Sequence, residues 1–289
     1  MTLPNYLADM IKGFENNDPR YKDLSNHLGQ SNKDMLINLP YEQLGELAEL
    51  RSLSIKNNEI SKIDDRIGAL TALELLDLSE NPLHTISSEI GKCVHLKLFK
   101  AASTAEIPLE DKLQLLEGKY EPNYLSDAGL RTLPASFGHL KQLISLYLEE
   151  NRFEVIPDAI FELENLNFLD ISFNEIKYIS PKIGQLKNLT YLKLSWNKFH
   201  ELPDEIGQLK QLVRLRLDGL TLHRLPEGIG GLENLEMLEI CYGKVDEIPA
   251  TIKHLKKLKH IYLYRTEISA IDLNMLKVLL PDCQLHLDF

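Results

Sequence analysis

The stretch NLTYLKLSWNKFHELPDEIGQL, residues 188–209, changes its apolar spacing halfway along. Over residues 189–194 the pattern Leu-x-x-Leu-x-Leu alternates as a short strand with one buried face does. After Asn197 the apolar residues spread out, and Pro203 interrupts them. Trp196, the only tryptophan of the chain, falls where the alternation leaves a side chain outside. The stretch therefore predicts one strand followed by a return segment.

The same pattern recurs every 23 residues on both sides of this stretch. Its neighbours are LNFLDISFNEIKYISPKIGQL, from Leu166, and LVRLRLDGLTLHRLPEGIGGL, from Leu212. Leu96 and Leu143 are 47 residues apart, which is two repeats plus one residue, so one repeat is expected to start at Tyr120. Counted in this way, ten repeats run over residues 50–280. They start at Leu50, Leu73, Leu96, Tyr120, Leu143, Leu166, Leu189, Leu212, Leu235 and Leu258.

The repeat, Leu-x-x-Leu-x-Leu-x-x-Asn-x-Leu followed by Leu-Pro-x-x-Ile-Gly-x-Leu, resembles the leucine-rich repeat family in its 23-residue intracellular and bacterial form. The resemblance implies an α/β fold, a right-handed solenoid with a concave parallel β-sheet. Stacking is also expected physically, because one repeat cannot bury its own apolar face. The family pattern further implies a ladder of buried amides at Asn58, Asn81, Asn151, Asn174 and Asn197.

Five repeats depart from this ladder, at Thr104, Ala128, Leu220, Gly243 and Thr266. Threonine can still form a hydrogen bond, whereas Ala128, Leu220 and Gly243 cannot do so through a side chain. We predict local irregularity in these repeats. Pro122 also falls within the strand of the repeat from Tyr120, and proline lacks a ladder donor. This predicts a weakened strand there and a longer loop over residues 105–119.

The chain is predicted to form a single domain over residues 1–289. Residues 1–49 form an N-terminal cap, residues 50–280 the ten repeats and residues 281–289 a C-terminal cap. The helical cap at the N-terminus is predicted from the helical spacing of Leu7, Met10, Ile11 and Phe14. Residues 275–280 read as a last helical turn and residues 285–287 as a final strand, so the domain is expected to be complete.

Composition limits the partners and the compartment. The net charge of −11 disfavours nucleic acid and anionic membrane surfaces. Three cysteines without a Cys-x-x-Cys pair argue against a disulfide framework or a Cys-rich zinc site. The sequence has neither a signal-peptide pattern nor an apolar run of about 18 residues. We expect a cytoplasmic monomer without cofactor or metal.

Catalytic motifs are also missing from the sequence. It contains no phosphate-binding loop, no His-Glu-x-x-His and no Gly-x-Ser-x-Gly. The glycines at 228, 230 and 231 belong to the repeat, and Cys241 and His260 are read as unrelated neighbours rather than a nucleophile and its base. The chain is therefore expected not to be an enzyme.

Large side chains gather at strand positions that point away from the core. Their residue types are those enriched at the centres of protein interfaces, although aromatic residues also cover one another in ordinary sheets. We favour a binding face, on which Arg214 and Arg216 suit an acidic group of the partner. The predicted site consists of Tyr147, Phe168, Phe173, Tyr191, Trp196, Arg214, Arg216, Tyr242, Tyr262 and Tyr264.

The predicted function is that of a protein–protein interaction module that binds a partner protein on its concave face. Two alternatives remain open. The chain is the targeting domain of a larger effector such as a ubiquitin ligase, or it is a regulatory subunit in a phosphatase or small-GTPase pathway.

Overall fold

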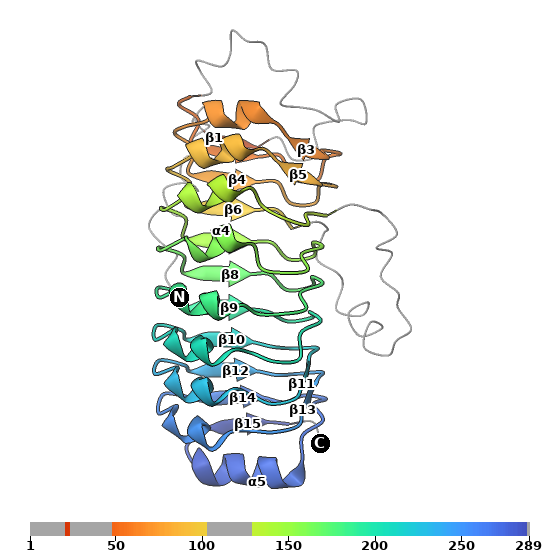
Figure 1. Cartoon of the computed structure of the whole chain (residues 1–289), viewed down its shortest axis with the longest axis vertical. Helices are drawn as coiled ribbons and strands as arrows, with labels where there is room; N and C mark the ends of the chain where they lie inside the picture. The colour runs from red at the N-terminus through yellow and green to blue at the C-terminus, as the bar shows by residue number, and fades with distance from the viewer. Residues whose placement is uncertain (1–20, 24–47, 103–128, 288–289) are drawn as a thin grey trace.

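Each repeat that the structure describes supplies one short strand, and the strands pair in parallel to form a long sheet (Figure 1). The computed structural model describes residues 21–23, 48–102 and 129–287. The predicted N-terminal helical cap and the predicted loop over residues 105–119 lie outside these residues. The described part confirms the α/β leucine-rich-repeat architecture, a stack of coils with a sheet on one side and short helical turns on the return side.

The main sheet contains eleven of the described strands. In order along the sheet they are β1 (Tyr21–Asp23), β2 (Ser52–Ser54), β4 (Leu75–Asp77), β6 (Leu98–Lys100), β7 (Ser145–Tyr147), β8 (Phe168–Asp170), β9 (Tyr191–Lys193), β10 (Arg214–Arg216), β12 (Met237–Glu239), β14 (His260–Tyr262) and β15 (Gln284–His286).

One predicted strand is missing from this order. β6 pairs directly with β7, with Phe99 opposite Leu146, so the strand expected in the repeat from Tyr120 does not lie between them. The Asn151 Nδ2 atom donates to the Ala101 carbonyl at 2.7 Å, as each ladder amide does to the coil before it. The backbone N–H of Gly129 donates to the Leu83 carbonyl at 3.0 Å. Residues 96–102 and 129–142 therefore belong to one coil rather than two.

The return half of each repeat is a single helical turn. Proline at the start of most turns sets φ for entry into the turn, and the Ile or Phe within the turn is buried. The turns are η3 (Asp65–Ala69), η4 (Ser88–Lys92), η5 (Ala135–His139), α4 (Asp158–Phe161), η6 (Pro181–Gln185), η7 (Asp204–Gln208), η8 (Glu227–Gly231) and η9 (Ala250–His254). The core is the continuous layer of Leu and Ile between these turns and the sheet.

The predicted amide ladder is present. Asn174 is buried, and its Nδ2 atom donates to the carbonyls of Leu148 (3.0 Å), Ile171 (3.2 Å) and Ser172 (3.0 Å). Its Oδ1 atom accepts the Phe153 N–H at 3.0 Å. One side chain thus satisfies backbone groups of two successive coils where the chain turns inward, which a buried backbone requires.

Two of the predicted irregular repeats use backbone pairing in place of the amide. β11 (Thr221–Leu222) and β13 (Lys244–Val245) form a separate two-stranded sheet in these repeats. A similar pair, β3 (Lys62–Ile63) and β5 (Thr85–Ile86), lies in repeats that keep the amides Asn58 and Asn81. The Lys244 N–H donates to the Leu220 carbonyl at 2.8 Å. A Cβ added to Gly243 would lie 2.2 Å from that carbonyl oxygen, so only glycine allows this approach.

The C-terminal end is closed by a helix and a last strand. α5 (Ala270–Leu279) is longer than the predicted turn, and Ser269 caps it by accepting the Asp272 N–H at 3.0 Å. Leu276 of α5 packs on the core, and β15 pairs with β14, as the prediction of a final strand required.

Candidate functional site

All ten predicted site residues lie outside the core and are half-buried. Along each strand, the first and third residues point away from the Leu core and form the concave face of the sheet. The residue just after the strand turn has a positive φ in repeat after repeat, for example 58° at Trp196 and 54° at Phe173. The ten residues divide into three ring clusters and a pair of arginines.

The strand cluster consists of Tyr147, Phe168 and Tyr191, which lie on the neighbouring strands β7, β8 and β9. Tyr147 and Phe168 stack with ring centroids 4.6 Å apart, and Phe168 meets Tyr191 edge-on at 5.2 Å. Both geometries are favourable for aromatic pairs. The structure thus brings together three residues that the repeat phase placed on one face.

The turn cluster consists of Phe173, Trp196 and Tyr242, all at the positive-φ position. Phe173 and Trp196 stack at 5.6 Å with planes 10° apart, and Trp196 lies 6.4 Å from Tyr242. The indole reaches across Gly219, where an added Cβ would lie 2.4 Å from two indole carbons. Trp196 therefore lies on the outside of its strand, yet it also packs against its neighbours.

The two predicted arginines have different surroundings. Arg216 makes ion pairs with Asp218, at 3.1 Å from Nη2, and with Glu239, at 3.0 Å from Nε. Burial alone would lower the pKa of Arg216, but these two carboxylates more than offset it and the pKa is raised. Arg214 instead places its Cζ atom 5.8 Å from the centre of the Tyr191 ring. The charge of Arg216 is already neutralised within the chain, whereas that of Arg214 faces outward.

Sequence reasoning missed several residues of this face. Lys193 Nζ lies 5.6 Å from the Phe168 ring centroid and makes an ion pair of 2.8 Å with Asp170. His286 of β15 stacks on Tyr262 at 4.2 Å and, with Tyr264 and His260, completes an end cluster. The same 23-residue phase that identified Tyr191 also places Lys193 on this face. His286 lies beyond the repeats, and the only signal for it was the final strand predicted over residues 285–287, in which it alternates with Leu285 and Leu287.

Glu149 is a half-buried acid beside the strand cluster. Its Oε2 atom is inaccessible to solvent and has no hydrogen-bond partner. Burial and the nearby charge of Asp170 raise the pKa of Glu149 to about 7. This carboxyl group therefore changes its charge near neutral pH.

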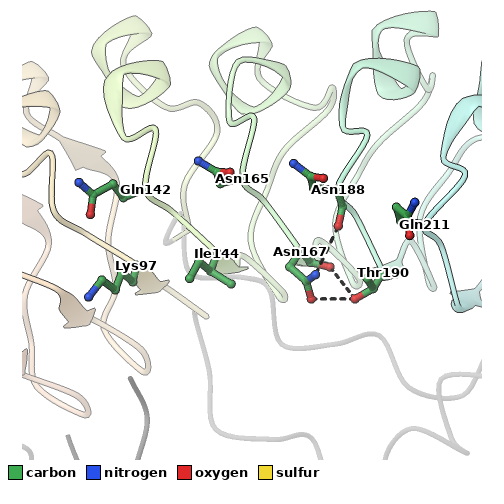
Figure 2. A pocket seen from close by; sticks show the side chains of 8 residues that line it. All are labelled: Lys97, Gln142, Ile144, Asn165, Asn167, Asn188, Thr190 and Gln211. Atoms are coloured by element: carbon green, nitrogen blue, oxygen red, sulfur yellow. Dashed lines mark hydrogen bonds between the residues drawn. The ribbon is translucent and has the colours of Figure 1, made fainter. Parts of the chain in front are cut away.

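A shallow cavity of about 610 Å³ lies at the edge of the sheet where β7, β8 and β9 begin. Figure 2 shows its lining of amide side chains on successive coils. Thr190 Oγ1 donates to Asn167 Oδ1 at 2.7 Å, and Asn167 Nδ2 donates to the Asn188 carbonyl at 3.3 Å. These contacts join one coil to the next, which gives the amides a structural role.

The described residues offer little for nucleophilic or metal chemistry. Burial raises the pKa of the Cys93 and Cys241 thiols to about 12 and that of Cys283 to about 11, so the described thiols are protonated at neutral pH. Residues 48–102 and 129–287 contain no group of three His, Cys, Asp or Glu side chains placed to hold a metal ion. No helix within the described ranges has the length and apolar character to cross a membrane.

Comparisons with known proteins agree with this architecture. Family models for a leucine-rich repeat region and for leucine-rich repeats match residues 160–280, 124–176 and 72–93. No curated protein matches the sequence.

Three solved structures illustrate the likeness. A leucine-rich repeat protein of Leptospira interrogans is 30% identical over 86% of this chain, with a TM-score of 0.62. The plant peptide hormone receptor RGFR1, in complex with RGF2, is 28% identical over 83%, with a TM-score of 0.62. The leucine-rich repeat ectodomain of the Arabidopsis thaliana membrane receptor kinase GASSHO1/SCHENGEN3, in complex with CASPARIAN STRIP INTEGRITY FACTOR 2, is 26% identical over 86%, with a TM-score of 0.64.

The chain spans 62%, 36% and 28% of the length of these three solved chains. The family models, the solved structures and the coil geometry all lead to one assignment. The chain belongs to the leucine-rich repeat family.

Proposed function

We propose that this chain binds a partner protein on the concave face of its sheet, through the three ring clusters. The observation that carries the proposal is the gathering of the rings at positions that the core does not need. A patch of half-exposed aromatic side chains on a surface typically marks a contact site.

The solved relatives support a peptide-like segment as the bound part of the partner. RGFR1 and GASSHO1/SCHENGEN3 were each solved with a ligand, and RGFR1 is described as a peptide hormone receptor. An extended segment suits a face built from parallel strands, because equivalent side chains repeat about every 4.8 Å across the sheet. The segment then meets one ring or one charge per strand.

The test is affinity capture of partners with the wild-type chain and three variants. Phe168→Ala and Trp196→Ala remove one ring each from the strand and turn clusters. Truncation of such an anchor costs about 2 kcal/mol of binding or more. Glu201→Ala changes an exposed side chain away from the sheet face and serves as the control.

Melting temperatures decide between binding and packing. Trp196→Ala also loses the stack on Phe173, which contributes about 1 kcal/mol to stability. Proteins retained by wild type and Glu201→Ala but lost by both ring variants support the proposal. If the ring variants melt earlier and retain every captured protein, the rings only cover one another and the proposal is wrong.

A further inference from the structure

Two cations bracket the strand cluster. Lys100 Nζ lies 5.1 Å from the centre of the Tyr147 ring, at one end of the cluster. Arg214 lies over Tyr191 at the other end. Among the described residues, neither cation has a carboxylate within ion-pair distance. The faces of the rings hold both cations in place without neutralising them.

The cations between and beside them are already neutralised. Lys193 is paired with Asp170, and its pKa is raised because that charge outweighs the effect of burial. Arg216 is paired with Asp218 and Glu239. Around the strand cluster, the cations that form no ion pair with a carboxylate of the described residues are therefore the two bracketing ones, Lys100 and Arg214.

The acidic residues near Lys100 and Arg214 do not form ion pairs with these two cations among the described residues. Asp77 lies opposite Lys100 in the strand register, its Oδ1 atom accepts the Ser79 N–H at 3.0 Å, and among the described residues it makes no ion pair with Lys100. Glu149 is close to Lys100 and holds its proton up to about neutral pH. Glu236 lies near Arg214, but it forms an ion pair of 2.8 Å with Lys259.

The distance between the two cations sets the spacing of the acidic groups that a ligand would need. Lys100 is on β6 and Arg214 on β10, four strands apart in the sheet order. At about 4.8 Å per strand the two side chains are separated by roughly 20 Å. An extended chain advances about 3.3 Å per residue, so roughly six residues span that distance.

We propose that the concave face takes an extended segment of a partner protein that carries two acidic side chains about six residues apart, with apolar residues between them. The acidic side chains pair with Lys100 and Arg214, and the apolar residues lie on Phe168. Arg214 offers a planar fork of donors whose face already rests on Tyr191, which suits a carboxylate. This inference rests on the proposed function and specifies the partner's chemistry.

The experiment uses displayed peptide libraries selected on the full chain. One library fixes Asp or Glu at positions i and i+6 with random residues between them. A second moves the acids to i and i+3, and a third has Asn or Gln at i and i+6. The first library is expected to enrich most, and its peptides are then measured by fluorescence anisotropy.

Double-mutant cycles test the pairing directly. Arg214→Gln and Lys100→Gln should each lower the affinity for a selected peptide about tenfold. This loss of affinity should vanish when the matching acid of the peptide is replaced by its amide. Arg224→Gln removes the same charge from an exposed side chain off this face and should change affinity little.

Each outcome bears on a different claim. Peptides that depend on Phe168 but show no coupling to Lys100 or Arg214 would overturn this inference and leave the proposed function standing. Peptides insensitive to every substitution on the concave face, or a failure of all three libraries to yield binders, would count against both. Equal enrichment of the i+3 library would show that the spacing argument is wrong.

Discussion

Glu149 places a carboxyl group where its ionisation is costly. The folded-state pKa of about 7 exceeds the ordinary value of 4.5, so the folded chain holds this proton more tightly than the unfolded chain. The contribution of Glu149 to stability is therefore greatest below about pH 4.5, falls as the pH rises to about 7, and is constant above that. The total change is about 1–3 kcal/mol, because the residue is only partly shielded.

The change Glu149→Gln should remove this dependence and stabilise the chain at about pH 8. Urea unfolding between about pH 5 and pH 8 measures it, as the difference in unfolding free energy between variant and wild type. Glu201→Gln, at an exposed side chain, is the control and should give a constant difference. A Glu149→Gln difference that is also constant with pH would show that Glu149 ionises normally.

Asn174 tests the amide ladder at the same scale. Asn174→Ala removes three donated hydrogen bonds and one accepted bond, and leaves buried backbone groups of two coils without partners. The cost should be about 2–4 kcal/mol in unfolding free energy. Asn165→Ala is the matched control, because the Nδ2 atom of Asn165 makes one exposed bond, to the Lys141 carbonyl at 2.8 Å. Similar losses in both variants would contradict a special role for the buried ladder.

The sequence predicted the direction of these side chains, but it did not predict their ion pairs. The ladder and the ring positions follow from a fixed period, which decides the direction of each side chain. Ion pairing does not follow from the period. Arg214 and Arg216 occupy equivalent outward positions two residues apart, and only the placement of Asp218 and Glu239 shows that one of them is already paired.

At the scale of the repeat, Gly219 is required by its neighbour rather than by its own backbone. Its φ of 66° is close to the values of 52–60° at seven non-glycine residues elsewhere, such as Glu80 and Tyr242. A side chain at this position is therefore acceptable to the coil. It is unacceptable to the indole of Trp196, which occupies the space of the missing Cβ.

The change Gly219→Ala should displace Trp196 and loosen the turn cluster. Because Trp196 is the only tryptophan, its fluorescence emission reports the change directly and should shift to longer wavelength. The loss of stability should be about 1–2 kcal/mol. Gly68→Ala is the control, since its Cβ would meet mainly the flexible side chains of Glu89 and Lys92. An unchanged emission spectrum would show that the indole does not rest on Gly219.

The repeat between Leu96 and Leu143 shows where periodicity misleads. A spacing of 47 residues is close to two repeats, and counting alone favoured a further strand. The signs against it were the one extra residue and Pro122 within the supposed strand. Pairing between β6 and β7 is a long-range contact, and no local pattern in the sequence specifies which strands become neighbours.

For the whole molecule, this pairing means that the stack is continuous across residues 103–128. Each coil contacts mainly the coils beside it, so stability is approximately a sum over neighbouring interfaces. The interface between β6 and β7 has the same register as the others, with Leu98 opposite Ser145 and Lys100 opposite Tyr147. The coil that contains β6 is therefore formed by residues 96–102 and 129–142.

Deleting residues 105–128 should consequently leave the solenoid intact. The deletion restores a spacing of 23 residues between Leu96 and Leu143, and it places Thr104 at the ladder position between Asn81 and Asn151. Adding Thr104→Asn supplies the missing amide. Thermal and urea unfolding of the shortened chain should remain cooperative, and Thr104→Asn should raise its unfolding free energy by about 1 kcal/mol. Loss of cooperative unfolding in the shortened chain, with or without Thr104→Asn, would show that the deleted residues are part of the stack.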